Sequence, residues 1–268
     1  MKTIKSANSS DIITVGDGVF YQCSSLISVN FPAVTTIGSK AFYSCSSLKN
    51  ISLPAATMIG SYAFESCRSL TSISLPAVTT IENYAFSMCR SLTSMNFPAA
   101  TMIRSNAFYQ CSSLKNISLP LATTIGEWAF QSCNSLTSIS LPAATTIGDG
   151  AFFWCNSLKN ISLPVATTIG GRAFYWCDSL TSISLPATTM IRISAFGGCT
   201  KLSQVYVLAS GVCALDTSAF QSTPKTSSSY LGYFGSIYVP ESLVSAYKTA
   251  KNWSAYSSRI TAYTGGDK

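Results

Sequence analysis

The sequence predicts a β-rich solenoid, a single elongated domain of stacked 22-residue coils. The first observation is a strict 22-residue period, in which a cysteine recurs at each step and a phenylalanine stands three positions before it. The cysteines in this register are Cys23, Cys45, Cys67, Cys89, Cys111, Cys133, Cys155, Cys177 and Cys199. The second observation is a recurring set of leucine and isoleucine anchors between them. A fixed period with such anchors is typical of a solenoid, in which each unit buries its apolar side against its neighbours.

Each unit begins with a short strand, as in Leu-Thr-Ser-Ile-Ser-Leu-Pro of the third cysteine unit. Ile73 and Leu75 alternate with Ser72 and Ser74, so the apolar side chains point to one face and the serines to the other. Pro76 lacks an N–H and ends the ladder. Strands of successive units are therefore expected to form a parallel sheet with a spacing of about 4.8 Å.

A second β-prone segment and a turn complete the unit. Residues 79–81, Thr-Thr-Ile, favour a short strand on the opposite wall. Ala85–Cys89 is predicted to be a single helical turn, because Phe86 and Cys89 are three positions apart and would share its inward face.

Two motifs recur in order, Leu-x-x-Ile-x-Leu-Pro and Ile-Gly-x-x-Ala-Phe-x-x-Cys, over about residues 12–207. Together they resemble the BspA-like class of leucine-rich repeats. The segment 236–263, SIYVPESLVSAYKTAKNWSAYSSRITAY, is similar to the closing segment of such proteins in gut Bacteroidetes. The resemblance implies a leucine-rich-repeat solenoid, a curved right-handed superhelix with a parallel sheet on one face and short strands and helical turns on the other. It also implies a surface or secreted protein that binds host or microbial ligands and catalyses nothing.

The chain is expected to divide into three parts. Residues 1–22 supply half a repeat that covers the first strand, residues 23–207 form the solenoid, and residues 208–268 form a degenerate last repeat with a helical cap. Covered ends are expected because open sheet edges invite aggregation.

The last part carries its own local signals. Residues 222–230, STPKTSSSY, are expected to form an exposed loop. Residues 241–250 follow a proline and space their apolar side chains by three or four, which predicts a helix. Trp253 and Ile260 are expected to seal the base of the column.

The ten cysteines raise the alternatives of disulfides or a metal site. Metal ligands cluster at short spacings such as C-x₂-C, which do not occur here, and the chain has no histidine. The Cβ vectors of in-register cysteines run parallel, so buried free thiols that act as small apolar side chains are the favoured interpretation. Cys213 lies out of register, and a Cys199–Cys213 disulfide stays an open alternative.

No catalytic, cofactor or nucleic-acid site is predicted. Without histidine the usual general base and nucleophile pairs are absent. The acids of the repeats fall one per unit at turn positions: Glu65, Glu82, Glu127, Asp149 and Asp178. The net charge is +7, but the basic residues are dispersed and form no cluster typical of nucleic-acid binding. No apolar run is long enough to predict a membrane span.

The concave sheet face is the usual binding surface of a curved solenoid. Its candidate contact residues are Asn116, Ser118, Ser138, Ser140, Asn160 and Ser162. All are short, polar and uncharged, which favours bonding from rung to rung that solubilises the sheet. Avidity for a repetitive polymer is the functional alternative.

Variation between the repeats indicates a second candidate site. Aromatic residues gather in the turns of the seventh and eighth units and the turn before them: Trp128, Phe153, Trp154, Tyr175 and Trp176. Trp154 and Trp176 occupy equivalent positions one coil apart, which would allow them to stack. Exposed tryptophan and tyrosine are enriched at interaction sites. The alternative is that the rings fold down over the column as structural cover.

The predicted function is a non-enzymatic, adhesin-like binding protein. Its expected partner is a host or microbial surface protein or a glycan, met outside the cell or on its surface. The alternative is a structural or self-associating scaffold with weak association between copies and no dedicated ligand. The location follows from the resemblance alone, because residues 1–11, MKTIKSANSSD, lack the apolar stretch of a secretion signal.

Overall fold

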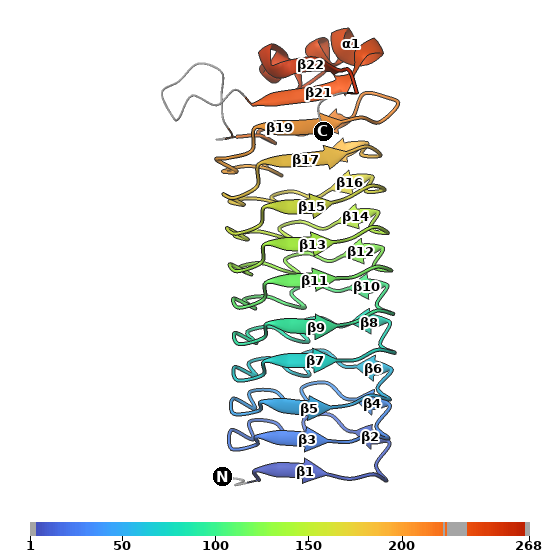
Figure 1. Ribbon diagram of the computed structural model, residues 1–268, viewed down its shortest axis with the longest axis vertical. Coiled ribbons are helices and arrows are strands. Elements are labelled where there is room, and N and C mark those ends of the chain that lie inside the picture. The colour runs from blue at the N-terminus through green and yellow to red at the C-terminus, as the bar shows by residue number, and fades with distance from the viewer. Residues whose placement is uncertain (1–3, 222, 224–234, 266–268) are drawn as a thin grey trace.

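The chain folds into a column of stacked coils. The computed structural model describes residues 4–221, 223 and 235–265, and Figure 1 shows the coils following one long axis from the N-terminal to the C-terminal end. Most coils contribute a longer strand and a two-residue strand, joined by turns. The predicted loop at 222–230 lies outside the described residues, apart from Thr223.

The longer strands form one wall of the column. They are β1 (Ser6–Asn8), β3 (Ser28–Asn30), β5 (Asn50–Ser52), β7 (Ser72–Ser74), β9 (Ser94–Asn96), β11 (Asn116–Ser118), β13 (Ser138–Ser140), β15 (Asn160–Ser162), β17 (Ser182–Leu185), β19 (Gln204–Val207), β21 (Ser236–Pro240) and β22 (Ile260–Tyr263). Hydrogen bonds divide them into the parallel blocks β1-β3-β5, β7-β9, β11-β13-β15 and β17-β19-β21-β22.

The two-residue strands form another wall. They are β2 (Thr14–Val15), β4 (Thr36–Ile37), β6 (Met58–Ile59), β8 (Thr80–Ile81), β10 (Met102–Ile103), β12 (Thr124–Ile125), β14 (Thr146–Ile147), β16 (Thr168–Ile169), β18 (Met190–Ile191) and β20 (Ala214–Leu215). The strands β8 to β20 form one seven-stranded parallel sheet, and β2-β4-β6 form a separate one. Equivalent residues of successive coils pair directly, as Ile139 does with Ile161, so the predicted solenoid with a parallel sheet is confirmed.

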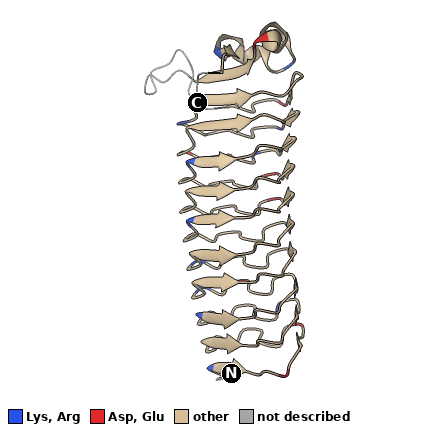
Figure 2. Ribbon diagram, turned by 45° about the vertical axis from the view of Figure 1, so that its right-hand side comes forward, with Lys and Arg blue, Asp and Glu red and all other residues tan. Residues whose placement is uncertain are grey.

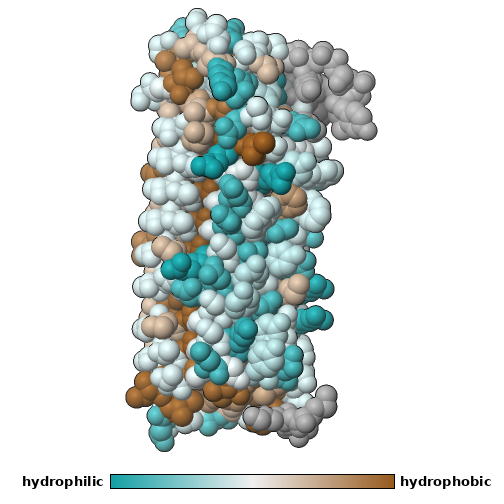
Figure 3. Space-filling view, turned by 180° about the vertical axis from the view of Figure 1, so that it is seen from behind, coloured by the Kyte–Doolittle hydropathy of each residue, from teal (hydrophilic) through white to brown (hydrophobic). Residues whose placement is uncertain are grey.

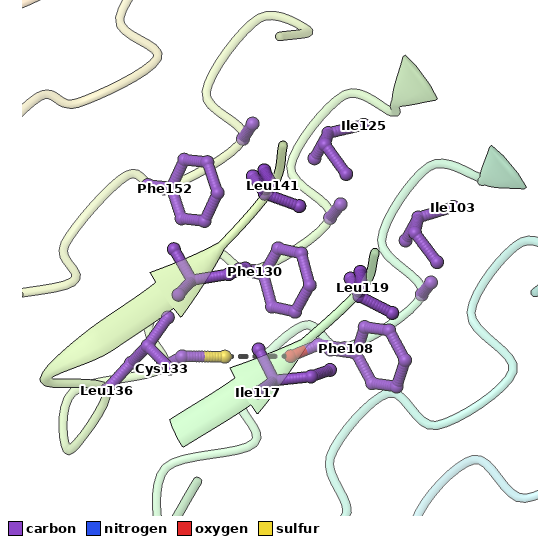
Figure 4. Packing of buried hydrophobic residues seen from close by; sticks show 14 of the residues in the cluster. Ile103, Phe108, Ile117, Leu119, Ile125, Phe130, Cys133, Leu136, Leu141 and Phe152 are labelled. Carbon is purple, nitrogen blue, oxygen red and sulfur yellow. Dashed lines mark hydrogen bonds between the residues drawn. The ribbon is translucent and has the colours of Figure 1, made fainter. Parts of the chain in front are cut away.

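Phenylalanine rings stack along the centre of the column. Neighbouring rings from Phe20 to Phe220 lie 5.1–5.6 Å apart between centroids, with interplanar angles of 1–16°. Figure 4 shows Phe108, Phe130 and Phe152 in one such row, with leucines and isoleucines in rows beside them. The alternation predicted for the strands is confirmed, because Ile73 is buried between exposed serines.

The cysteines lie beside this stack, and all ten are buried and free. The open alternative of a Cys199–Cys213 disulfide is therefore not found. From Cys45 to Cys199, each thiol donates a hydrogen bond to the carbonyl oxygen of the phenylalanine in the coil before, with Sγ–O distances of 2.9–3.2 Å. Figure 4 shows one of these bonds, from Cys133 to Phe108.

The turn that carries the phenylalanine and the cysteine differs from the predicted helical turn. Within Ala85–Cys89 the backbone N–H groups of Ala85, Ser87 and Cys89 bond to carbonyls three residues back, and Met88 has a left-handed φ of 59°. The N–H of Phe86 instead donates to Ala107 of the next coil, at 2.8 Å. Because alternate N–H groups bond to the neighbouring coil, the segment forms β-turns and not a helix.

The first coil is more complete than the sequence indicated. The strand β1 pairs in register with β3, Ser6 with Ser28 and Asn8 with Asn30, in addition to the expected β2. This strand was not predicted because it lacks the Leu and Pro of the repeat motif, with Ile4 and Ser10 at those positions. The register of the repeat nevertheless extends to it.

The C-terminal end is closed by helical turns and one further strand. The 3₁₀ helix Glu241–Leu243 leads into α1 (Val244–Thr249), which confirms the predicted helix, and a second 3₁₀ helix spans Ser254–Arg259. Trp253 is fully buried, packs against Phe220 and donates its indole N–H to the Cys213 carbonyl at 2.6 Å. Ile260 is buried as expected, but it opens the unpredicted strand β22, which pairs with β21.

Candidate binding site

The aromatic residues singled out in the sequence lie together on the turn side of the column. We call Trp128, Phe153, Trp154, Tyr175 and Trp176 the aromatic edge. Trp154 and Trp176 are 48% and 46% exposed, whereas the other three rings are half-buried. The edge therefore presents two tryptophans to solvent on a base of three partly covered rings.

The rings contact one another in a different order from the one expected. Phe153 stacks on Tyr175, with centroids 5.3 Å apart and planes at 10°. Trp154 is tilted against Phe153 at 5.0 Å, and Trp176 is tilted against Tyr175 at 6.2 Å. The stacked pair across the two coils is thus Phe153 with Tyr175, and not the predicted Trp154 with Trp176.

Three rings of the edge rest on glycines of the following coil. A Cβ added to Gly150 would lie 2.1 Å from the Trp128 ring, one on Gly197 would lie 2.6 Å from the Tyr175 ring, and one on Gly198 would lie 3.3 Å from the Trp176 ring. The rings therefore cover backbone as well as facing outward. Structural cover, the alternative raised by the sequence, is therefore present at this edge together with exposed aromatic surface.

The same turn side carries aromatic pairs that the sequence analysis missed. Tyr21 stacks on Tyr43 and Tyr62 on Tyr84, with centroids 4.9 and 4.8 Å apart. Lys40 places its ammonium 5.6 Å from the Tyr62 ring centroid. The signal was present in the sequence, because the two tyrosines of each pair stand at equivalent positions of successive repeats.

A shallow polar depression lies on the same edge toward the N-terminal end. It is open to solvent, has a volume of about 360 Å³ and is lined by Gln22, Ser24, Ser44, Ser46, Ser66 and Arg68. Gln22, Ser44 and Ser66 hold the positions that Trp154 and Trp176 hold further along. One edge of the column thus changes from small polar residues to exposed aromatic ones.

The face of the longer strands is polar and partly bonded from rung to rung. Ser138 donates to the side-chain oxygen of Asn116 at 2.7 Å, and the Asn96 amide donates to Ser74 at 3.2 Å. Ser118, Ser140, Asn160 and Ser162, also predicted as contact residues, are exposed on the same face. Figures 1 and 2 show a column with little bend, so this face is closer to flat than concave. Bonding between rungs is the role that these contacts support.

The acids of the repeats are held singly by local contacts. Glu82 forms a salt bridge with Arg104 at 3.0 Å, and Asp149 accepts the Gly171 N–H at 2.7 Å. Burial raises the pKa of the Glu65 and Asp178 carboxyls, against the opposing effects of Lys40 and Lys201. Within the described part of the chain, no group of three or more His, Cys, Asp or Glu side chains is placed to hold a metal ion.

Charge and apolar surface are spread thinly along the column. Figure 2 shows isolated basic and acidic positions along the coils, without a continuous patch of either sign. Figure 3 shows the side behind the longer strands as mostly pale, weakly polar surface crossed by a narrow apolar stripe. Among the described residues, no helix is long and apolar enough to cross a membrane.

The sequence matches the model of a known protein family. The profile of the BspA type leucine rich repeat region matches residues 13–137 and 123–238, in six copies. These two ranges cover most of the column. A comparison with curated proteins found no match.

Solved structures of leucine-rich repeat proteins are similar to this chain. A leucine-rich repeat protein from Eubacterium ventriosum is similar over 86% of this chain and 87% of its own, with 18% identity and a TM-score of 0.51. A leucine rich cell surface protein from Faecalibacterium prausnitzii matches with 22% identity, coverage of 93% and 92%, and a TM-score of 0.41. A leucine-rich repeat protein from Bacteroides ovatus matches with 21% identity, coverage of 97% and 92%, and a TM-score of 0.43. At 18% identity, the likeness to the Eubacterium ventriosum protein concerns the fold alone.

Proposed function

Because this chain belongs to the BspA-type leucine-rich repeat family, whose members are typically non-enzymatic protein-binding scaffolds, we propose that it is an adhesin-like binding protein. Its partner is a host or microbial surface protein or a glycan, met at the cell surface or outside the cell. Residues 23–207 form the binding solenoid of this proposal, and residues 1–22 and 208–268 form its two ends. The aromatic edge is the contact site.

The exposure of Trp154 and Trp176 is the observation that carries the proposal. Both side chains are about half exposed, although tryptophan is among the residues that gain most from burial. Tryptophan is also the residue most enriched among the energetically dominant positions of protein interfaces. A flat aromatic surface suits the face of a sugar ring as well as an apolar patch on a protein.

The backbone at these positions supports the same conclusion. Trp154 and Trp176 have left-handed φ values of 62° and 60°, a conformation that is unfavourable for a bulky side chain. The equivalent residue of other coils is small or flexible, as in Ser44, Ser132 and Gly198. The same left-handed φ recurs at this position in the other coils, as at Gln22 and Met88, so the repeat imposes it, and a tryptophan there is a bulky choice for a position that serine fills elsewhere.

The rings are also fixed before a partner arrives. Phe153 and Tyr175 stack on each other, and each contacts the tryptophan that follows it in the chain. The Trp176 ring also lies against Gly198. A rigid aromatic surface loses little conformational entropy on binding, so its contact area converts more fully into affinity.

The test is the variant Trp154→Ser/Trp176→Ser on an array of glycans and extracellular-matrix proteins. Serine already occupies the equivalent left-handed position in Ser44, Ser66 and Ser132, so the coil is expected to fold unchanged. For each ligand that the parent chain binds on the array, we expect the double variant to have a roughly tenfold or greater loss of affinity, as is typical for residues that dominate an interface.

Gln22→Ser is the matched control, because Gln22 occupies the repeat position of Trp154 and Trp176 in a coil near the N-terminal end, far from the aromatic edge. It should leave binding unchanged. Retention of every ligand by the double tryptophan variant would refute the aromatic edge as the contact site. The oligomeric mass of the parent chain and of the double variant is measured in parallel. A lower oligomeric mass of the variant, without loss of ligand, would instead assign the aromatic edge to contact between copies of the chain.

A further inference from the structure

An amide and a carboxyl group occupy the same repeat position next to the aromatic edge. Asn156 stands two residues after the exposed Trp154. Asp178 stands two residues after the exposed Trp176, one repeat later. In the orientation that satisfies its amide, Asn156 donates to the carbonyl oxygens of Trp176 and Trp154, at 2.9 and 3.1 Å. One side chain thus ties together the two turns that present the tryptophans.

The next pair of turns repeats the same backbone geometry. The N–H groups of Trp154 and Trp176 each donate to the next coil, to the carbonyl of the residue that follows the core phenylalanine, and both distances are 2.9 Å. The two pairs of turns are therefore in the same register. For Asp178, the carbonyl groups equivalent to those that Asn156 bonds are those of Gly198 and Trp176.

One oxygen of the Asp178 carboxyl is buried without a hydrogen bond. This Oδ1 atom has no partner in the described part of the chain. Besides burial, the charge of Asp178 raises the pKa of the Cys177 and Cys199 thiols, which belong to two successive coils, so the carboxyl lies close to both coils. A buried oxygen in this situation costs free energy unless a proton or another donor satisfies it.

The surroundings of this carboxyl favour its neutral form. Burial raises the pKa of the Asp178 carboxyl above its ordinary value, against the opposing effect of the Lys201 ammonium. The thiols of Cys177 and Cys199 are the other titratable groups beside it, and burial raises the pKa of Cys199 to about 12. In the acidic range, therefore, the carboxyl is the member of this group that changes its charge.

We propose that Asp178 is a positioning residue for Trp176, whose carboxyl faces the carbonyl oxygens of Trp176 and Gly198, bonds to them when it is protonated and repels them when it is ionised. A carboxylate presents only lone pairs to a carbonyl oxygen, whereas a carboxyl that has taken a proton from solvent donates a hydrogen bond, as the Asn156 amide does. The Trp176 turn is then tied to the next coil at acidic pH and released at neutral pH. The consequence for binding rests on the proposed function: the aromatic edge binds its partner more tightly as the pH falls.

The first test needs no ligand. It is an NMR titration of the full 268-residue chain, labelled with ¹³C and ¹⁵N, between about pH 3 and pH 8. We expect the Asp178 carboxyl carbon and the Trp176 backbone N–H to change with one midpoint, above the pH of ~3.9 at which an ordinary aspartate titrates. Asp178→Asn should abolish the change at Trp176. Asparagine already occupies this position in Asn134 and Asn156, so this variant is expected to fold unchanged.

Three further variants test the position and the charge separately. Asn156→Asp puts the same carboxyl one coil earlier, so the N–H signal of Trp154 should acquire a pH dependence of its own. Lys201→Gln removes the opposing charge and should move the midpoint of Asp178 to higher pH. Glu127→Gln is the matched control, because Glu127 is an exposed carboxyl of a nearby coil, and it should leave the titration unchanged. Circular dichroism of every variant establishes that the fold is intact.

The second test measures binding, with each ligand that the parent chain binds on the array. We expect a roughly fivefold higher affinity at the acidic end of the titration than at its neutral end, as is typical for the gain of one hydrogen bond. Asp178→Asn should bind with the higher affinity at both ends. The comparison of the two proteins removes any titration of the ligand itself.

The outcomes separate this proposal from the proposed function. A Trp176 signal that does not follow the Asp178 carboxyl, or that persists in Asp178→Asn, would overturn the positioning role. Equal pH dependence of binding in the parent chain and in Asp178→Asn would overturn its effect on affinity. A linked titration, together with full retention of ligand by Trp154→Ser/Trp176→Ser, would support the positioning role and refute the aromatic edge as the contact site.

Discussion

At the scale of single residues, the cysteine of each repeat is more than a small apolar side chain. Its thiol donates to the phenylalanine carbonyl of the coil before, as Cys133 does to Phe108 at 3.2 Å. The same carbonyl also accepts the N–H of Cys111 at 3.1 Å. A buried carbonyl oxygen therefore has both of its lone pairs satisfied, which explains a cysteine at this position better than its size does.

The first prediction separates these two roles at Cys133. Cys133→Ser keeps a donor for the Phe108 carbonyl, whereas Cys133→Ala removes the donor and leaves a small cavity. We expect alanine to lower the free energy of unfolding by about 1–2 kcal/mol and serine to lower it by less. Urea unfolding of the parent chain and of the two variants measures their free energies of unfolding. If alanine is the milder change, the thiol acts only as an apolar filler.

At the scale of one coil, up to three hydrogen-bonded ladders fix a unit to the next, because the longer strands pair only within their four blocks and the short strands within their two sheets. The longer strand and the short strand supply two, and the turn supplies the third, as when Phe130 donates its N–H to Ala151 at 2.8 Å. Threonine hydroxyls add a further row at the corner, where the Thr145 hydroxyl donates to the Thr123 carbonyl at 3.2 Å. These side-to-side bonds leave little freedom for a coil to slide on its neighbour.

The second prediction concerns the turn at Gly150. Gly150 has a φ of +61°, and an added Cβ would meet the Trp128 ring at 2.1 Å. Gly150→Ala should therefore cost about 1–3 kcal/mol of stability through backbone and steric strain. It should also displace Trp128, which a change in tryptophan fluorescence reports.

Gly211→Ala is the control for this turn, since nothing lies within 4 Å of its added Cβ. It should change stability by less than about 0.5 kcal/mol. Equal effects at the two glycines would contradict the seating of Trp128 on Gly150.

At the scale of the whole molecule, the thiols form one collective feature of the column. Burial raises the pKa of every cysteine from Cys45 to Cys213, to about 12 for Cys45, Cys199 and Cys213. In the unfolded chain a cysteine titrates near pH ~8.5. The folded protein therefore holds these protons more tightly than the unfolded chain.

The third prediction is a steep loss of stability at alkaline pH. A raised pKa in the folded state contributes stability that is complete below pH ~8.5 and is lost as the pH rises toward 12. Each buried thiol adds a slope of about 1.4 kcal/mol per pH unit in this window. Urea unfolding under reducing conditions at a series of pH values measures the total.

A single cysteine variant is the internal control for this slope. Cys111→Ser should reduce it by the share of one thiol, while the slope below pH ~8 stays unchanged. A free energy of unfolding that does not vary across the alkaline range would contradict the burial of the cysteine column.

The sequence predicted most of the fold from particular residues. The cysteine and phenylalanine spacing indicated the coil length and the shared core, and Ile73 between two serines indicated which face is buried. Leu243, Val244 and Tyr247 after Pro240 indicated the terminal helix. The candidate site was only partly accessible in this way. The sequence identified the five residues of the aromatic edge, but not which of their rings touch.

The repeat by itself determined which residues of successive coils are equivalent, since a constant period assigns each side chain to a row. Tertiary structure alone decided how the rows meet: that Phe153 stacks on Tyr175, and that the thiols from Cys45 to Cys199 reach the phenylalanine carbonyl of the coil before. The physical reason is that a sequence period assigns each residue its place within a coil, but leaves the contacts between neighbouring coils undetermined. The offset between neighbouring coils is set by hydrogen bonds between their backbones, and those exist only once the coils are stacked.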